Sequence, residues 1–186
     1  AMSVFVAEEL SEVLNTKVVI GRINMGLLNR IIIDDVLLDD QSGQEMLKVT
    51  RLSAKFDIMP FFKGKISISS VQLFGFNINL RKETPDSPPN FKFVLDAFAS
   101  KDTVKKENSL DLRINSILIR RGRMSYHVLS EEETPGKFNA KHIQLQNIIA
   151  NISLKALSKD SLNLGIKRLS LDEKASGFSL KKMSLK

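Results

Sequence analysis

The hydrophobic pattern of the chain changes phase in the middle of segments that otherwise look like strands. In "ISISSVQLFG", Ile66 and Ile68 alternate with polar residues, as do Val71 and Leu73, but two serines separate the two pairs. Side chains of a strand point alternately to its two faces, so a regular strand would send the two pairs to opposite faces. The pattern therefore predicts either a change of face or an irregularity that restores it.

The same interrupted pattern recurs along the chain. With 42% apolar residues, about 0.6 strict copies are expected by chance over this length. Five strict copies occur, and looser copies start at Val18 ("VVIGRINM") and Leu112 ("LRINSILI"). The four further strict copies are "LKVTRLSA" (Leu47, Val49, Leu52, Ala54), "FNAKHIQL" (Phe138, Ala140, Ile143, Leu145), "LGIKRLSL" (Leu164, Ile166, Leu169, Leu171) and "FSLKKMSL" (Phe178, Leu180, Met183, Leu185).

Three structures could produce such a repeat. A two-residue hairpin at the centre would favour Asn-Gly or Asp-Gly, and the central pairs here, such as Thr-Arg and Lys-Lys, are poor turn formers. A strand that passes from one core to another would need many cores. A β-bulge adds one residue, restores the facing and bends the strand. Bulges at matching places in successive strands predict a long, curved antiparallel sheet with one continuous apolar face.

The remaining segments complete a mainly β fold in a single β-rich fragment that covers residues 1–186. "SVFVAEELSEVLNTK" has an apolar helical face and a serine cap, and "KETPDSPPN" is the clearest break in the chain. The last residues stop inside a repeat copy, so we expect further strands beyond residue 186. The predicted parts are a helix at 3–16, a first strand group at 17–81, a proline-rich loop with a short Phe-rich helix at 90–99 and a polar loop within 82–109, and a second strand group at 110–186.

Composition narrows the function. The net charge is +7, but lysines and arginines are spread over polar strand positions, and aromatic residues make up only 6% of the chain. Nucleic-acid binders concentrate basic and aromatic side chains on one surface, so no nucleic-acid partner is expected. The tightest basic cluster, Arg120, Arg121 and Arg123, is a candidate contact for a lipid headgroup or a partner. The absence of cysteine excludes disulfide and thiolate chemistry.

Candidate chemistry is sparse. His127 and His142 lack neighbouring ligand spacing, which favours structural strand histidines over a metal site. Asp34, Asp35, Asp39 and Asp40 lack the spacing of a calcium loop, which favours a hairpin turn with solvated acids over a cation site. No nucleotide, nucleophile or metalloprotease motif is present, so neither an enzymatic function nor a cofactor nor a metal is predicted.

An apolar sheet face needs a second layer, and this sequence offers only two short helices to provide one. The face must be closed by folding of the sheet on itself, by a partner protein or by an apolar ligand. An acyl chain suits such a trough because its burial contributes about 0.8 kcal/mol per CH₂ and needs no directional chemistry. Phe91, Phe93 and Phe98 could also line a ligand groove or belong to an ordinary core. The predicted lining consists of Leu47, Val49, Leu52, Ala54, Ile66, Ile68, Val71, Leu73, Phe74 and Phe76. Because the alternation of apolar and polar residues slips between Leu73 and Phe74, the sequence leaves open whether Phe74 and Phe76 or their neighbours face inward.

Residues 17–80 resemble the N-terminal part of proteins of the AsmA-like/TamB family, which includes the inner-membrane subunit of the translocation and assembly module. The shared order is an initial helix, an "I-G-R-I" strand, an "L-x-D-x-x-G" turn, "L-x-V-x-x-L", "P-F-F-K-G-K-I" and "I-x-I-x-x-V-x-L". The similarity extends more weakly to residue 186, and the Phe-rich helix departs from the family pattern. These are apolar patterns rather than catalytic signatures.

The resemblance implies a β-taco, a bent sheet with a hydrophobic interior. It also implies a location on the periplasmic face of the inner membrane of a didermic bacterium, through an anchor upstream of residue 1. The implied function is non-enzymatic binding and transport of phospholipid or another acyl-chain ligand between the inner and outer membranes, contributing to outer-membrane biogenesis. The alternative is an interaction module that assists assembly or secretion of an outer-membrane β-barrel protein by strand addition.

Overall fold

The computed structural model describes residues 2–59, 66–101, 110–157 and 162–185. Two helices and eight strands make up this part of the chain. Side chains of Ile66, Phe98 and Leu185 lie outside the described set, as does the Phe61–Phe62 pair. The elements are α1 (Met2–Leu14), β1 (Val18–Gly26), β2 (Arg30–Asp39), β3 (Glu45–Phe56), β4 (Ile66–Lys82), α3 (Lys92–Lys101), β5 (Leu110–Val128), β6 (His142–Leu157), β7 (Leu162–Glu173) and β8 (Ser179–Leu185).

The strands form one sheet in the order β1-β2-β3-β4-β5-β6-β7-β8. The predicted mainly β fold with a helix at each predicted place is confirmed. The expectation of an entirely antiparallel sheet was wrong for one pair, because β4 and β5 run parallel. Parallel neighbours require a long crossover, and the segment that carries α3 returns the chain to the end of the sheet where β4 began. β5 continues without a break through Arg121 and Gly122.

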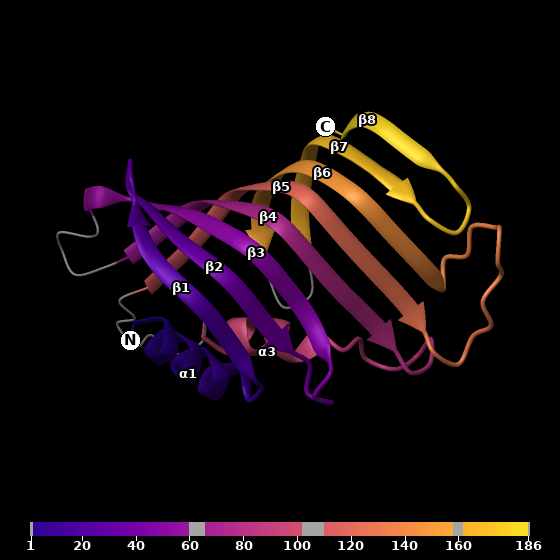
Figure 1. The fold of residues 1–186 in the computed structure, drawn as a ribbon, viewed down its shortest axis with the longest axis horizontal. Coiled ribbons are helices and arrows are strands. Elements are labelled where there is room, and N and C mark those ends of the chain that lie inside the picture. The colour runs from indigo at the N-terminus through magenta and orange to yellow at the C-terminus, as the bar shows by residue number, and fades with distance from the viewer. Residues whose placement is uncertain (1, 60–65, 102–109, 158–161, 186) are drawn as a thin grey trace.

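The sheet arches, and both helices lie on its inner side (Figure 1). α1 and α3 pack against the β1–β3 end of the sheet, where Val18, Ile20 and Leu38 are buried. Phe91 and Phe93 join this cluster from the start of α3, so the Phe-rich segment covers one end of the apolar face. We call the inner surface of the arch the concave face and the opposite surface the outer face.

The bend of the sheet coincides with a row of irregular positions that crosses six strands. In β3, Val49 and Leu52 both contribute to the apolar cluster of the concave face although two residues separate them. The same two-residue spacing separates Leu73 from Phe76 in β4. We name these positions the kink row: residues 21–22 of β1, 34–35 of β2, 50–51 of β3, 74–75 of β4, 120–121 of β5 and 146–147 of β6.

Residues of the kink row lie opposite one another in successive strands. Arg22, Asp34, Arg51, Phe74 and Arg120 are direct cross-strand partners from β1 to β5. Every strand from β1 to β4 contains the slip at the same place, so the pairing keeps its register across the row. The kink row therefore bends neighbouring strands together instead of distorting a single strand.

Positive backbone φ angles mark the kink row. Asp35 has φ 56°, Gly75 has φ 66°, Arg121 has φ 53° and Asn147 has φ 52°. Residues other than glycine adopt this conformation at a cost of about 1 kcal/mol or more, and Asp and Asn tolerate it best. At Gly75 a side chain would also meet Thr50 of β3, whose Oγ1 lies 2.7 Å from the position of a Cβ atom.

Ser69 and Ser70 form a separate β-bulge. Lys55 pairs with Ser70, but Phe56 pairs with Ile68, so β4 contains one residue more than β3 at this point. Ile68 and Val71 consequently share a face, as the sequence predicted. The predicted slips at residues 167–168 of β7 and 181–182 of β8 are also found. In β7, Ile166 and Leu169 pair with alternate residues of β6 and so share a face. In β8, Leu180 and Met183 likewise pair with alternate residues of β7.

One predicted copy of the pattern was wrong. "FNAKHIQL" does not form a bulged strand, because β6 begins at His142 and Phe138 is exposed in the preceding turn. The slip of β6 lies further on, between Leu145 and Ile148, which both belong to the apolar cluster.

The acidic turn between β2 and β3 differs from the predicted set of solvated acids. Asp40 is 2% exposed and accepts hydrogen bonds from the backbone N–H groups of Ser42 and Gln44. Its Oδ2 lies 2.8 Å from Nη2 of Arg81 and 3.3 Å from Nδ2 of Asn90. Burial alone would raise the pKa of Asp40, but these hydrogen bonds and the charge of Arg81 outweigh it and lower the pKa. Asp40 thus joins the turn to the end of β4 and to the segment before α3.

Candidate functional site

The concave face contains a continuous apolar cluster that extends from β2 to β7. Its buried centre consists of Val49, Phe76, Ile148 and Ala150. Half-buried apolar side chains surround this centre and keep part of their surface exposed. They are Val36, Leu47, Leu52, Leu73, Ile78, Ile119, Met124, Leu145, Ile152, Leu169 and Leu171.

Gly122 allows the centre of this cluster to form. A Cβ atom at Gly122 would lie 2.3 Å from Cε1 of Phe76 and 3.0 Å from Cβ of Ile148. The Phe76 ring of β4 therefore lies over the glycine of β5 and reaches Ile148 of β6. An aromatic ring that covers a glycine on the neighbouring strand is a recurrent device for fixing the register of a curved sheet.

Most of the predicted lining residues are on the concave face. Leu47, Val49, Leu52, Leu73 and Phe76 belong to the apolar cluster. Ala54 and Val71 are buried cross-strand partners, and they share the face of Leu52 and Leu73 by strand alternation. Ile68 is half-buried and shares that face through the serine bulge.

Phe74 is the exception among the predicted lining residues. It is 42% exposed and lies on the outer face, where the guanidinium carbon of Arg121 is 5.3 Å from its ring centroid. The kink at Gly75 turns Phe76 inward and leaves Phe74 outward, opposite Arg51. The sequence left the facing of Phe74 and Phe76 open, and the kink at residues 74–75 of β4 determines it.

Several residues of the cluster were not predicted from the sequence. Ile119, Met124, Ile148 and Ala150 lie beside kinks in β5 and β6 that the hydrophobic pattern of the sequence does not indicate. The glycine in "LIRRGRM" was a usable signal, since a glycine inside a strand often marks the close approach of a neighbour.

On the outer face, Asp34 joins two arginines of the kink row. Its carboxylate lies 3.0 Å from Nη2 of Arg22 and 2.7 Å from Nε of Arg51. Hydrogen bonds from Arg51 and Arg22 lower the pKa of Asp34. Asp34 is only 6% exposed, so it is neither a solvated acid nor part of the hairpin turn that the sequence suggested.

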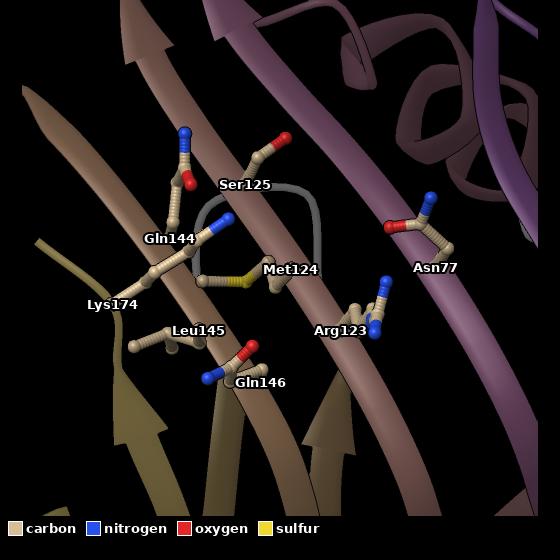
Figure 2. Close-up of a pocket in the computed structure, with 8 residues that line it drawn as sticks. All are labelled: Asn77, Arg123, Met124, Ser125, Gln144, Leu145, Gln146 and Lys174. Atoms are coloured by element: carbon tan, nitrogen blue, oxygen red, sulfur yellow. The ribbon is translucent and has the colours of Figure 1, made fainter.

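Two hollows on the described surface are small, and polar and apolar side chains line both of them. One, of about 250 Å³, lies beside the Asp40 turn and the start of α3. The other, of about 120 Å³, lies over β4, β5 and β6 (Figure 2). Ligand pockets are commonly about 300–1,000 Å³, so neither hollow has the size of an enclosed acyl-chain site. The residues around the second hollow are Asn77, Arg123, Met124, Ser125, Gln144, Leu145, Gln146 and Lys174.

The two histidines, distant in sequence, meet in the structure. His127 of β5 and His142 of β6 are direct cross-strand partners, and their Nδ1 atoms lie 2.8 Å apart. Burial, and secondarily the charge of His142, lower the pKa of His127. The register between β5 and β6 brings them together, and the spacing of the two histidines in the sequence does not reveal this register.

No protein-family model and no curated protein matches the chain. Among the described residues, neither helix is long and apolar enough to cross a membrane.

Proposed function

We propose that the chain is a non-enzymatic cell-envelope module that binds phospholipid acyl chains along the concave face of its arched sheet. The observation that carries this proposal is the continuity of the apolar cluster from β2 to β7. Within the described residues, α1 and α3 pack against the β1–β3 end of the face, and the apolar side chains around the buried centre of the cluster stay half-buried. An acyl chain that lies along them would remove their remaining apolar surface from water, which is favourable by about 25 cal/mol per Å².

The kink row supports this mode of binding. It keeps apolar side chains on both halves of each bent strand directed into the same trough, so a flexible chain could contact β3 to β7 without a break. The resemblance to the AsmA-like/TamB family supports the biological setting. In that setting the module passes phospholipid between the inner and outer membranes and contributes to outer-membrane biogenesis.

Site-specific photocrosslinking tests the proposal. A benzophenone amino acid replaces Leu73 on the concave face or its neighbour Gln72 on the outer face, and the protein is incubated with phospholipid vesicles. Crosslinking of phospholipid at position 73 and not at position 72 is expected. Native mass spectrometry of the gently purified protein should also detect bound phospholipid. Equal crosslinking at both positions, together with a lipid-free protein, would contradict acyl-chain binding by this face.

A second candidate function is an interaction with a β-barrel protein by strand addition. The observation that favours it is the open sheet: within the described chain, β8 pairs with β7 on one side only. An unpaired edge strand offers a row of backbone N–H and C=O groups to a partner strand. Capture of an outer-membrane β-barrel protein by a lipid-free chain would favour this function over lipid binding.

A further inference from the structure

Three side chains with metal-binding atoms converge at the end of the sheet where β5 passes into β6. The Nδ1 atoms of His127 and His142 lie 2.8 Å apart. A carboxylate oxygen of Glu133, in the segment that connects the two strands, completes a group whose ligand atoms all lie within 4.8 Å of one another. Both histidines are half-buried, whereas Glu133 is exposed. The cluster lies apart from the concave apolar cluster and has no part in the proposed lipid binding.

His142 is already oriented as a ligand. Its Nε2 lies 2.7 Å from the carbonyl oxygen of Glu131. A carbonyl oxygen can only accept, so Nε2 carries the hydrogen and Nδ1 of the neutral ring presents a lone pair toward His127. In metal sites a backbone carbonyl commonly accepts from the free ring nitrogen of a ligand histidine and so fixes its tautomer.

Backbone and side-chain hydrogen bonds hold the segment that connects β5 and β6 in place. The N–H groups of Leu129 and Ser130 donate to the carbonyl oxygens of Lys82 and Glu83, which extends the pairing beyond β4. Nδ2 of Asn139 donates to the carbonyl oxygen of Glu132, 3.1 Å away. The backbone around Glu133 is thus positioned beside the histidine pair before any ion binds, which lowers the entropy lost on binding.

We propose that His127, His142 and Glu133 form a binding site for a divalent transition-metal ion, with zinc as the best match. Two imidazoles and a carboxylate form a donor set that zinc accepts, with a fourth position left for water. Two nitrogens bound to one tetrahedral zinc lie about 3.3 Å apart, given Zn–N distances of about 2.05 Å. The Nδ1 atoms therefore need to separate by about half an ångström. The Nδ1 proton of His127 moves to Nε2, so that both lone pairs point at the ion.

The bound ion would join β5, β6 and their connecting segment. Because it binds the folded arrangement of three residues that are scattered in the unfolded chain, it stabilises the fold by mass action. We therefore expect zinc to raise the melting temperature of the whole chain.

Titration of the tag-free, chelator-treated protein with zinc chloride tests the site. Isothermal titration calorimetry should show one zinc ion per chain with a micromolar Kd, and differential scanning calorimetry should show a higher Tm. His142→Gln should abolish binding, and Glu133→Gln should weaken it by about 10-fold or more. Glu132→Gln is the matched control, because this neighbouring acid lies outside the cluster, and it should leave the affinity unchanged.

Cobalt(II) gives a second readout that does not depend on stability. Binding at the cluster should produce visible absorption bands that are lost in His142→Gln. If His142→Gln does not fold, Glu133→Gln provides the test, because it changes an exposed side chain. Absence of zinc binding to the wild-type chain, or equal affinity in Glu132→Gln and Glu133→Gln, would overturn the proposal.

Discussion

The Nε atom of Arg51 lies 2.7 Å from Oδ1 of Asp34, directly across the ladder between β2 and β3. Asp34 also accepts from Arg22 of β1, so one carboxylate joins three strands where the sheet bends. Arginine side chains that are about half-exposed contribute less than buried ones because solvent screens them. The two ion pairs nevertheless join β1, β2 and β3 at the kink row.

Asp34→Asn should lower the free energy of unfolding by about 1–2 kcal/mol at pH 7. The folded-state pKa of Asp34 lies below its ordinary value, so its contribution is complete above the unfolded pKa of about 4 and is lost as pH falls through the folded pKa. Urea denaturation at several pH values should therefore show the wild-type and variant curves converging in acid. Asp35→Asn is the control: Asp35 is the exposed neighbour of Asp34 and has φ 56°, which asparagine tolerates, so its substitution should change the free energy of unfolding little. A difference between Asp34→Asn and wild type that persists in acid would assign the effect to packing instead of charge.

Gly122→Ala should destabilise the chain by about 1–3 kcal/mol, because the new methyl group would overlap the Phe76 ring. In a double-mutant cycle, Phe76→Leu should remove part of this cost and give a coupling energy of about 1 kcal/mol. Chemical denaturation of the four proteins measures this coupling. Additive effects of the two substitutions would show that Phe76 does not lie over Gly122 in solution.

Leu28 at the tip of the β1–β2 hairpin has φ 56° and is 84% exposed. Leucine is strained in this conformation and gains no burial there, so Leu28→Asn should stabilise the chain by about 0.5–1 kcal/mol. Leu27→Asn is the matched control, because Leu27 is 88% exposed without a positive φ, and it should bring no such gain. Thermal unfolding compares the two variants. A loss of stability in Leu28→Asn would mean that the leucine side chain packs against the protein.

The sequence predicted the bend of the sheet where the outer positions of a strand are polar. Thr50 and Arg51 interrupt β3 between apolar pairs with polar neighbours, so the repeat was visible there. In β2, Ile32 and Leu37 occupy outer positions, and their hydrophobicity hides the slip at Asp34 and Asp35. In β5 the inward position after the slip is Gly122, which a search for apolar residues cannot recognise.

Long-range pairing accounts for the other differences. The parallel pairing of β4 with β5 depends on the path of the 83–109 connection, which hydrophobic periodicity does not encode. The burial of Asp40 depends on Arg81, 41 residues away, and the meeting of His127 with His142 depends on the register of β5 and β6. Local pattern predicted which residues are apolar and inward in β3 and most of β4, but not which polar groups would meet.

The most direct test of the concave face compares two adjacent residues with opposite facings. The two residues are Leu73, which is half-buried on the concave face, and Gln72, which points to the outer face. Val71 is less suitable, because it is only 8% exposed and a charge there would unfold the sheet. Leu73→Asp should reduce phospholipid retention several-fold, because a carboxylate is strongly disfavoured against an acyl chain, and Gln72→Asp should not. Circular dichroism checks that both variants fold, and lipid extraction with mass spectrometry measures retention. Equal retention in two folded variants would place any bound lipid elsewhere than on the concave face.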